Sequence, residues 1–258
     1  MPVPYITAHS GCENTPQDSM ASVEKALLLG VDIAEMDVRK APNGVLRVSH
    51  NQLDQAGYGE KLTLEAVFSR IKDTSLSLNC DLKEPSTLYD VLAMAAQFGF
   101  ARERLILSGC TSPEQLARDD SLVRRARIYL NIEEVLKFLY LSERLPGYDF
   151  RFSELMTSPW SFLESYLLTD ARLDKIVLFA QTLGVEGINL PIRCLTDQLV
   201  EKFQKAGTEI SVWTVNDEQD IERCIRAGAQ NITTLTPGLA LEKRRQLCRF
   251  PEMTGLMG

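Results

Sequence analysis

Two histidines and two carboxylates near the start of the chain have the types and spacing that acid–base chemistry at a metal requires. His9 and His50 each close a strand-like run. Between them, Glu35 and Asp37 lie two residues apart in an otherwise apolar run, so a strand would point both carboxylates to one face. Imidazoles beside a carboxylate pair are the parts of a metal-assisted acid–base hydrolase.

Each of these residues also has a purely structural interpretation. The histidines could be core side chains bonded to the backbone, or surface residues. Their place at the ends of strand-like runs favours proton transfer, which histidine performs in either direction near neutral pH. Glu35 and Asp37 could be an exposed acidic pair, but their apolar neighbours predict burial, and buried carboxylates need a cation. A hard divalent ion fits such oxygen ligands.

The segments that must position these side chains alternate between strand and helix patterns. Strands are expected at 3–8, 32–38, 76–82, 105–108, 126–131, 185–190, 209–215 and 230–234, and helices at 20–29, 63–72, 86–98, 172–183, 196–206, 217–227 and 237–247, with a further helix that opens at Ser112-Pro113. Such alternation predicts parallel βαβ units, and eight units predict a (β/α)8 TIM barrel of the α/β class. A doubly wound open sheet is the alternative, although no glycine-rich phosphate loop follows the first strand.

Two connections depart from the simple alternation. Pro42-Asn43-Gly44 predicts a turn after the second strand, and residues 45–49 extend the strand pattern beyond it. Residues 133–169 begin as a helix and become rich in aromatic side chains, which we interpret as an insertion that enlarges the fifth βα connection. The whole chain, 1–258, is expected to be a single barrel domain.

The composition limits the partners of the protein. A formal net charge of −7 argues against a nucleic-acid partner, which would call for a basic face. We expect a cytoplasmic protein without stable membrane insertion, because no secretory leader pattern and no apolar run approaching about 18 residues is present. The six dispersed cysteines lack C-x-x-C spacing, so reduced thiols are expected. No pattern in the sequence indicates the oligomeric state.

Six stretches resemble, in matching order, the motifs of the glycerophosphodiester phosphodiesterase family. They are Ala8-His9-Ser10-Gly11 with Glu13-Asn14-Thr15 (His-Arg-Gly…Glu-Asn-Thr in the family), Gly30 to Arg39 (its metal-binding strand), Asn43-Gly44 with His50-Asn51 (Asp-Gly…His-Asp), Leu78 to Lys83 (third-strand Glu-x-Lys), Val212 to Asp217 (Trp-Thr-Val-Asn) and Ala227 to Pro237 (Gly-x-Asp-x-Ile-x-Thr-x-x-Pro). No single motif is decisive, but the ordered set is specific and spans both ends of the chain.

The resemblance implies a TIM barrel that hydrolyses a small-molecule glycerophosphodiester to sn-glycerol 3-phosphate and an alcohol. It implies a divalent metal, Mg or Ca, held by Glu35, Asp37 and Asp81. It implies His9 and His50 as the acid–base pair. Asp81 departs from the family pattern, since most members have glutamate there.

Further residues are expected to bind the substrate. Lys83 could hold a phosphate oxygen, or pair with Asp81 or Glu35, or do both. Glu13 could orient the first histidine loop or bind a substrate hydroxyl, or it could be a cap. Trp213, at the end of the seventh strand, could fill the barrel or form an apolar wall for the alcohol. Ser10 occupies the place of the family's phosphate-binding arginine and is expected at the substrate.

Two other functions remain open at the level of sequence. Asn51 replaces the family's aspartate, and the insertion that usually covers the substrate after the second strand is reduced, since only 30 residues separate His50 from Asp81. The missing cover and the aromatic segment 148–166 would suit a lysophospholipase D-like activity on lysolipids. The changes at Ser10 and Asn51 would suit a pseudoenzyme that binds a phosphodiester without turnover.

Overall fold

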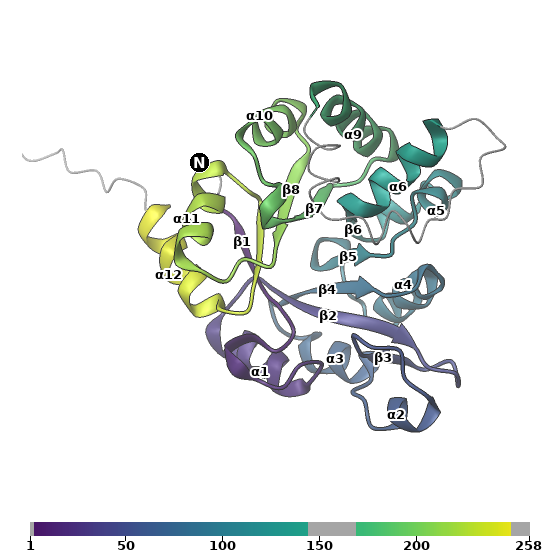
Figure 1. The fold of residues 1–258 in the computed structure, drawn as a ribbon. Coiled ribbons are helices and arrows are strands. Elements are labelled where there is room, and N and C mark those ends of the chain that lie inside the picture. Colours follow the sequence, from purple (N-terminus) through teal and green to yellow (C-terminus); the bar gives the residue numbers. More distant parts are fainter. Residues whose placement is uncertain (1–2, 144–168, 249–258) are drawn as a thin grey trace, which may run out of the picture.

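Eight parallel strands close into a barrel with helices around its outside (Figure 1). The computed structural model describes residues 3–143 and 169–248. The barrel strands are β1 (Tyr5–Ala8), β2 (Ile33–Lys40), β4 (Ser77–Leu82), β5 (Leu105–Gly109), β6 (Arg127–Asn131), β7 (Gly187–Pro191), β8 (Glu209–Trp213) and β9 (Asn231–Thr234). Strand β1 pairs in parallel with both β2 and β9, which closes the ring. The expected TIM barrel is therefore confirmed, and the open sheet is excluded.

The first helix begins and ends at capping residues. The Ser19 hydroxyl accepts a hydrogen bond from the backbone N–H of Ser22 at the start of the first helix, and Gly30 ends that helix with a φ of 67°. The described helices are α1 (Met20–Leu29), α2 (Gln55–Gly59), α3 (Leu64–Ile71), α4 (Leu88–Gln97), α5 (Pro113–Arg118), α6 (Ile132–Glu143), α9 (Asp170–Leu183), α10 (Asp197–Ala206), α11 (Glu218–Ala227) and α12 (Pro237–Leu247).

A ninth strand, β3 (Leu46–Val48), lies outside the barrel ring. The turn at Pro42-Asn43-Gly44 and the strand pattern after it agree with the structure, in which β3 runs back along β2 as an antiparallel hairpin. The turn contains Gly44, whose φ of 84° is readily adopted only by glycine. Beyond β3, the second connection holds only the five-residue α2 before α3 begins, in agreement with the reduced insertion.

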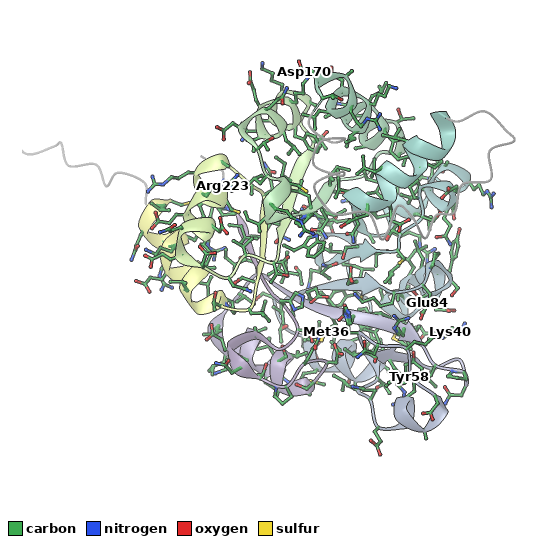
Figure 2. The ribbon with its side chains drawn as sticks, in the orientation of Figure 1. Met36, Lys40, Tyr58, Glu84, Asp170 and Arg223 are labelled. Atoms are coloured by element: carbon green, nitrogen blue, oxygen red, sulfur yellow. The ribbon has the colours of Figure 1, made fainter. Side chains whose placement is uncertain are left out.

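The main hydrophobic core lies between the barrel wall and the helices. Alternating side chains of each strand point outward into this core, to which Met36 of β2 belongs (labelled in Figure 2), while their neighbours point into the barrel. Inside the barrel, a small separate cluster consists of Ile33, Ile106 and Tyr129. The remainder of the interior carries polar side chains that lead up to the strand ends.

The fifth βα connection is enlarged, as the sequence predicted. It runs from the end of β6 to the start of β7 and includes both α6 and α9. The aromatic segment 148–166 lies outside the described residues. In the described part of the chain, no helix is both long and apolar enough to cross a membrane. The six cysteines, all in the described part of the chain, form no disulfide with one another.

Candidate active site

A pocket of about 250 Å³ at the C-terminal ends of the barrel strands brings both histidines together. Residues in or directly after each barrel strand line it, with others from loops: His9, Gln17, Glu35, Asp37, His50, Asn79, Asp81, Lys83, Ser108, Asn131, Asn189, Trp213, Thr214 and Thr233. Every site residue expected from the sequence is among them except Ser10 and Glu13.

Three carboxylates cluster on the β2–β4 side of this pocket. Asp37 and Asp81 are paired in register on adjacent strands, and one oxygen from each of Glu35, Asp37 and Asp81 lies within 4.8 Å of the others. Burial, followed by the charges of Asp37 and Asp81, raises the pKa of Glu35 well above its usual range. Crowded, buried carboxylate oxygens are what a hard divalent cation stabilises, so this donor set fits Mg or Ca.

Lys83 supplies the cation that the described protein places against this cluster. Its ammonium lies 2.6 Å from Asp37 Oδ1 and also pairs with Asp81. The expected ion pair with Asp81 is therefore present, while the second partner is Asp37 rather than Glu35. Burial alone would lower the pKa of Lys83, but the attraction of Asp81 and Asp37 outweighs burial and raises it. Lys83 thus stays charged and offsets part of the repulsion.

His50 reaches the pocket through the β2–β3 hairpin rather than from the end of a barrel strand. Its Nδ1 lies 3.0 Å from Asp37 Oδ2, and its backbone carbonyl accepts a hydrogen bond of 3.1 Å from Arg39 Nε. Arg39 also pairs with Glu84, which lies near Lys40 (Figure 2). The Glu84 carboxylate in addition accepts a 3.3 Å hydrogen bond from the backbone N–H of Lys40. The hairpin and the loop after β4 therefore hold the ring in place.

His9 follows β1 and faces the same carboxylates. Its Nδ1 lies 3.0 Å from the carbonyl oxygen of Ser10 and 3.8 Å from Glu35 Oε2. A carbonyl oxygen can only accept, so His9 Nδ1 carries a proton in this contact. The same tautomer fits His50, whose Nδ1 faces a carboxylate. In both rings, Nε2 is consequently the nitrogen left for proton exchange with a ligand.

Asp18 joins the two histidine loops. One oxygen of its carboxylate accepts a 2.9 Å hydrogen bond from the backbone N–H of His50, and the other accepts a 3.2 Å hydrogen bond from the Ser10 hydroxyl. The Asp18 backbone N–H in turn donates to that hydroxyl at 2.7 Å. The expectation that Ser10 contacts the substrate is not supported, because its buried hydroxyl is used by Asp18 and does not line the pocket.

Removal of the Asp18 carboxylate is expected to slow turnover without removing any group that touches the substrate. Asp18→Ala should lower kcat by about 10- to 100-fold, because small displacements of catalytic groups carry costs of that order. Asp18→Asn keeps an acceptor for the His50 N–H and should retain most of the activity. Steady-state kinetics and metal titration of both variants test this role. Equal losses in the two variants, or loss of metal binding in Asp18→Ala, would contradict it.

The Glu13-Asn14-Thr15 stretch does not line the pocket, and Glu13 makes the contact of a cap, the alternative that the sequence left open. Glu13 Oε1 accepts a 2.9 Å hydrogen bond from the backbone N–H of Gly238 in the first turn of α12, so this carboxylate caps a helix. Gln17 lines the pocket instead. The triplet Gln17-Asp18-Ser19, directly before α1, has side chains of similar shape to the family's Glu-Asn-Thr: Gln for Glu, Asp for Asn and Ser for Thr.

The remaining wall of the pocket is rich in neutral polar groups. Trp213 lies at the end of the seventh barrel strand, as expected, and its indole N–H is a buried donor without a partner in the described chain. Asn131 and Asn189 line the same wall, together with Thr233. The position of Asn131 at a strand end was the only signal in the sequence for this residue. This wall can donate hydrogen bonds to the oxygens of a polar ligand.

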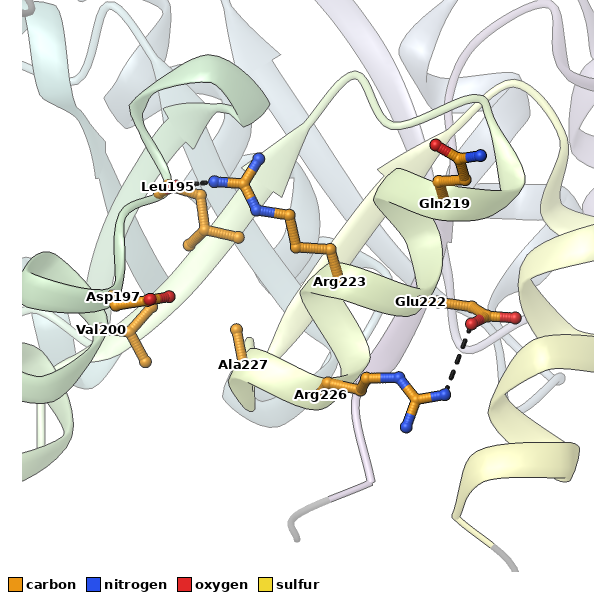
Figure 3. A pocket seen from close by; sticks show the side chains of 8 residues that line it. All are labelled: Leu195, Asp197, Val200, Gln219, Glu222, Arg223, Arg226 and Ala227. Carbon is orange, nitrogen blue, oxygen red and sulfur yellow. Dashed lines mark hydrogen bonds and ion pairs between the residues drawn. The ribbon is translucent and has the colours of Figure 1, made fainter.

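A second, larger groove lies outside the barrel between α10 and α11 (Figure 3). Its two arginines are already engaged: Arg226 lies 3.5 Å from Glu222, and Arg223 donates to the backbone carbonyl of Leu195. No histidine lines this groove. The pocket at the strand ends is therefore the candidate active site.

A barrel whose strand ends unite two histidines with a carboxylate cluster has the organisation of a TIM-barrel hydrolase. The model of the glycerophosphoryl diester phosphodiesterase family matches residues 9–239, and the chain belongs to this family. It is accordingly a phosphoric diester hydrolase.

Individual relatives agree with this assignment. A glycerophosphodiester phosphodiesterase of Caldanaerobacter subterraneus is 26% identical over 253 residues, covering 90% of this chain and 94% of the relative. A crystal structure of a glycerophosphodiester phosphodiesterase from Parabacteroides distasonis shares the fold with a TM-score of 0.67 at 18% identity, covering 96% and 99% of the two chains. An Oleispira antarctica phosphodiesterase, solved with the product sn-glycerol-3-phosphate, gives 0.64 at 15% identity, covering 93% and 96%.

Proposed function

We propose that this protein hydrolyses a glycerophosphodiester to sn-glycerol 3-phosphate and an alcohol in a metal-dependent reaction. The observation that carries the proposal is the convergence of both histidines and the three clustered carboxylates on one pocket. The Oleispira phosphodiesterase bound to sn-glycerol-3-phosphate supports the choice of product. Family membership supports the class of reaction.

Glu35, Asp37 and Asp81 are the residues that would hold the metal. When bound, a divalent cation supplies positive charge against the phosphoryl oxygens of the substrate. Asp37 has two further tasks, because it orients His50 through Nδ1 and pairs with Lys83. Lys83 contributes positive charge at the same place and is suited to hold a phosphate oxygen.

His9 and His50 would exchange protons with the substrate through Nε2. One ring accepts a proton from the attacking oxygen, which belongs to water or to a neighbouring substrate hydroxyl. The other ring donates a proton to the departing alcohol oxygen, so that no free alkoxide forms. The contacts of each Nδ1 keep the proton on that nitrogen and leave Nε2 available. Trp213 would form an apolar wall beside the alcohol group or donate its indole N–H to an oxygen of the substrate.

The direct test is hydrolysis of glycerophosphocholine by the purified protein in Mg or Ca. Release of sn-glycerol 3-phosphate and choline is expected, with activity falling to the uncatalysed level after chelation and returning when metal is restored. The same assay with lysophosphatidylcholine examines the lysophospholipase D-like alternative. A protein that binds sn-glycerol 3-phosphate yet hydrolyses neither substrate with any metal would be the pseudoenzyme and would refute the proposal.

A further inference from the structure

A chain of hydrogen-bonded polar side chains runs along the barrel interior from β1 through β9, β8 and β7 to β6. Each link joins neighbouring strands: Thr7 Oγ1 to Asn231 Oδ1 at 2.7 Å, Asn231 Nδ2 to Ser211 Oγ at 2.9 Å, Ser211 Oγ to Asn189 Oδ1 at 2.8 Å, and Asn189 Nδ2 to Asn131 Oδ1 at 2.9 Å. Every donor in this chain points toward Asn131, which lies at the end of β6 in the pocket wall.

The direction of this chain is fixed at Asn131. The backbone N–H of Gly109 lies 3.4 Å from Asn131 Oδ1, and a backbone N–H can only donate. Reversing the amides would place Asn131 Nδ2 against that N–H and leave two donors facing each other. Asn131 Oδ1 therefore accepts from Gly109 and from Asn189. Its Nδ2 group makes no hydrogen bond with the described part of the protein.

We infer that Asn131 Nδ2 donates a hydrogen bond to an oxygen of the substrate's glycerol phosphate moiety and so helps to determine specificity. The inference rests on the proposed function for its ligand. Phosphoryl and hydroxyl oxygens are acceptors, and the pocket already holds three carboxylates that repel anions. A neutral amide donor binds such oxygens at every pH. It also supplies a contact that the Ser10 hydroxyl cannot make, because that hydroxyl is bonded to Asp18.

Asn131→Asp isolates the donor. The carboxylate keeps an acceptor for Gly109 and for Asn189, so both contacts with the protein survive, while the group that faces the pocket changes from donor to acceptor. Asn131→Ala removes the donor without adding charge. The matched control is Asn43→Asp, in an exposed turn, where the retained oxygen still accepts from the backbone N–H of Val45 at 3.2 Å.

Calorimetric titration of the metal-loaded protein with sn-glycerol 3-phosphate and with inorganic phosphate gives the readout. Asn131→Asp is expected to weaken the binding of sn-glycerol 3-phosphate by about 10- to 100-fold, and Asn131→Ala by about 3- to 10-fold. These factors correspond to the loss of one hydrogen bond to a charged or to a neutral oxygen. Asn43→Asp should bind like the wild type. Parallel weakening of inorganic phosphate would identify a phosphoryl oxygen as the acceptor, and unchanged phosphate binding would identify a hydroxyl oxygen.

The inference is overturned if both Asn131 variants bind sn-glycerol 3-phosphate as the wild type does, or if Asn43→Asp weakens it equally. Metal titration of each variant shows whether the added charge of Asn131→Asp changes metal affinity. If it does, the binding of sn-glycerol 3-phosphate by the uncharged variant Asn131→Ala decides whether the inference holds. Wild-type protein that binds sn-glycerol 3-phosphate but hydrolyses no glycerophosphodiester would refute the proposed function alone. The two failures are therefore distinguishable.

Discussion

Replacing either histidine with alanine is expected to lower turnover by about 10²- to 10⁴-fold, the usual contribution of general acid–base catalysis. The metal affinity and the binding of sn-glycerol 3-phosphate should change far less, because His9 and His50 do not belong to the carboxylate cluster. Steady-state kinetics on glycerophosphocholine, with calorimetry for metal and product, separate the two effects. A variant that keeps near-wild-type turnover would remove that histidine from the mechanism.

The leaving group distinguishes the acid from the base. A p-nitrophenyl phosphodiester releases a stable anion that needs little protonation, whereas choline and glycerol leave as poor, basic alkoxides. The variant that lacks the general acid should therefore recover much of its activity on the p-nitrophenyl substrate. The variant that lacks the general base should stay slow on both substrates. Equal behaviour of His9→Ala and His50→Ala on both substrates would contradict a division of roles between the two rings.

Added imidazole provides a further check on His50. Its side chain is 57% exposed, against 27% for His9, so an imidazole molecule has easier access to the space that His50→Ala leaves. Rescue is expected to be greater for His50→Ala. Rescue should also depend on Asp37, which accepts from Nδ1 of the native ring. No rescue of either variant at any imidazole concentration would favour a positioning role over proton transfer.

The sequence was sufficient to predict the barrel and the carboxylate pair because both depend on local periodicity. Glu35 and Asp37 lie two apart on one strand, so their shared face follows from strand geometry alone. Asp81 could be placed beside them because parallel strands end at the same edge. The structure pairs Asp37 with Asp81 across that edge.

The positions that the sequence could not predict depend on contacts between distant segments. His50 was expected at the end of a strand, yet β3 is an antiparallel return strand and no periodicity distinguishes the two. The Glu-Asn-Thr motif was matched at Glu13, but Gln17 is the residue that lines the pocket. Glu13 instead caps α12, a contact between residues 225 apart in the chain that no local pattern could reveal. The direction of the Asn131 amide likewise depends on a ladder through five strands.

Replacement of Glu35 by glutamine is expected to stabilise the metal-free protein at neutral pH and to destabilise it relative to the wild type when metal is present. Burial and the neighbouring Asp37 and Asp81 charges raise the pKa of Glu35, so the metal-free folded state resists ionisation that the unfolded chain undergoes freely. The metal-free wild type therefore loses stability as pH rises from the ordinary glutamate range toward the raised pKa of Glu35. The amide of the variant cannot ionise, so metal-free Glu35→Gln should melt higher than the wild type at neutral pH and equally at acidic pH below that window.

Metal should invert this result. Removal of one carboxylate ligand should weaken Mg or Ca binding by more than about 100-fold, since loss of a mere outer partner of a ligand already costs about 10- to 100-fold. At an ion concentration about 100 times the Kd, binding raises the free energy of unfolding of the wild type by about 2.7 kcal/mol. At the same concentration Glu35→Gln should gain almost no stability, and it should lose its activity. The matched control is Glu24→Gln, an exposed glutamate whose pKa Arg70 lowers, which should melt slightly lower than the wild type without metal and keep the full metal-induced shift. Thermal melts of the three proteins from acidic to neutral pH, with and without metal, measure both effects. A metal-free Glu35→Gln protein that melts well below the wild type would assign Glu35 a structural role instead.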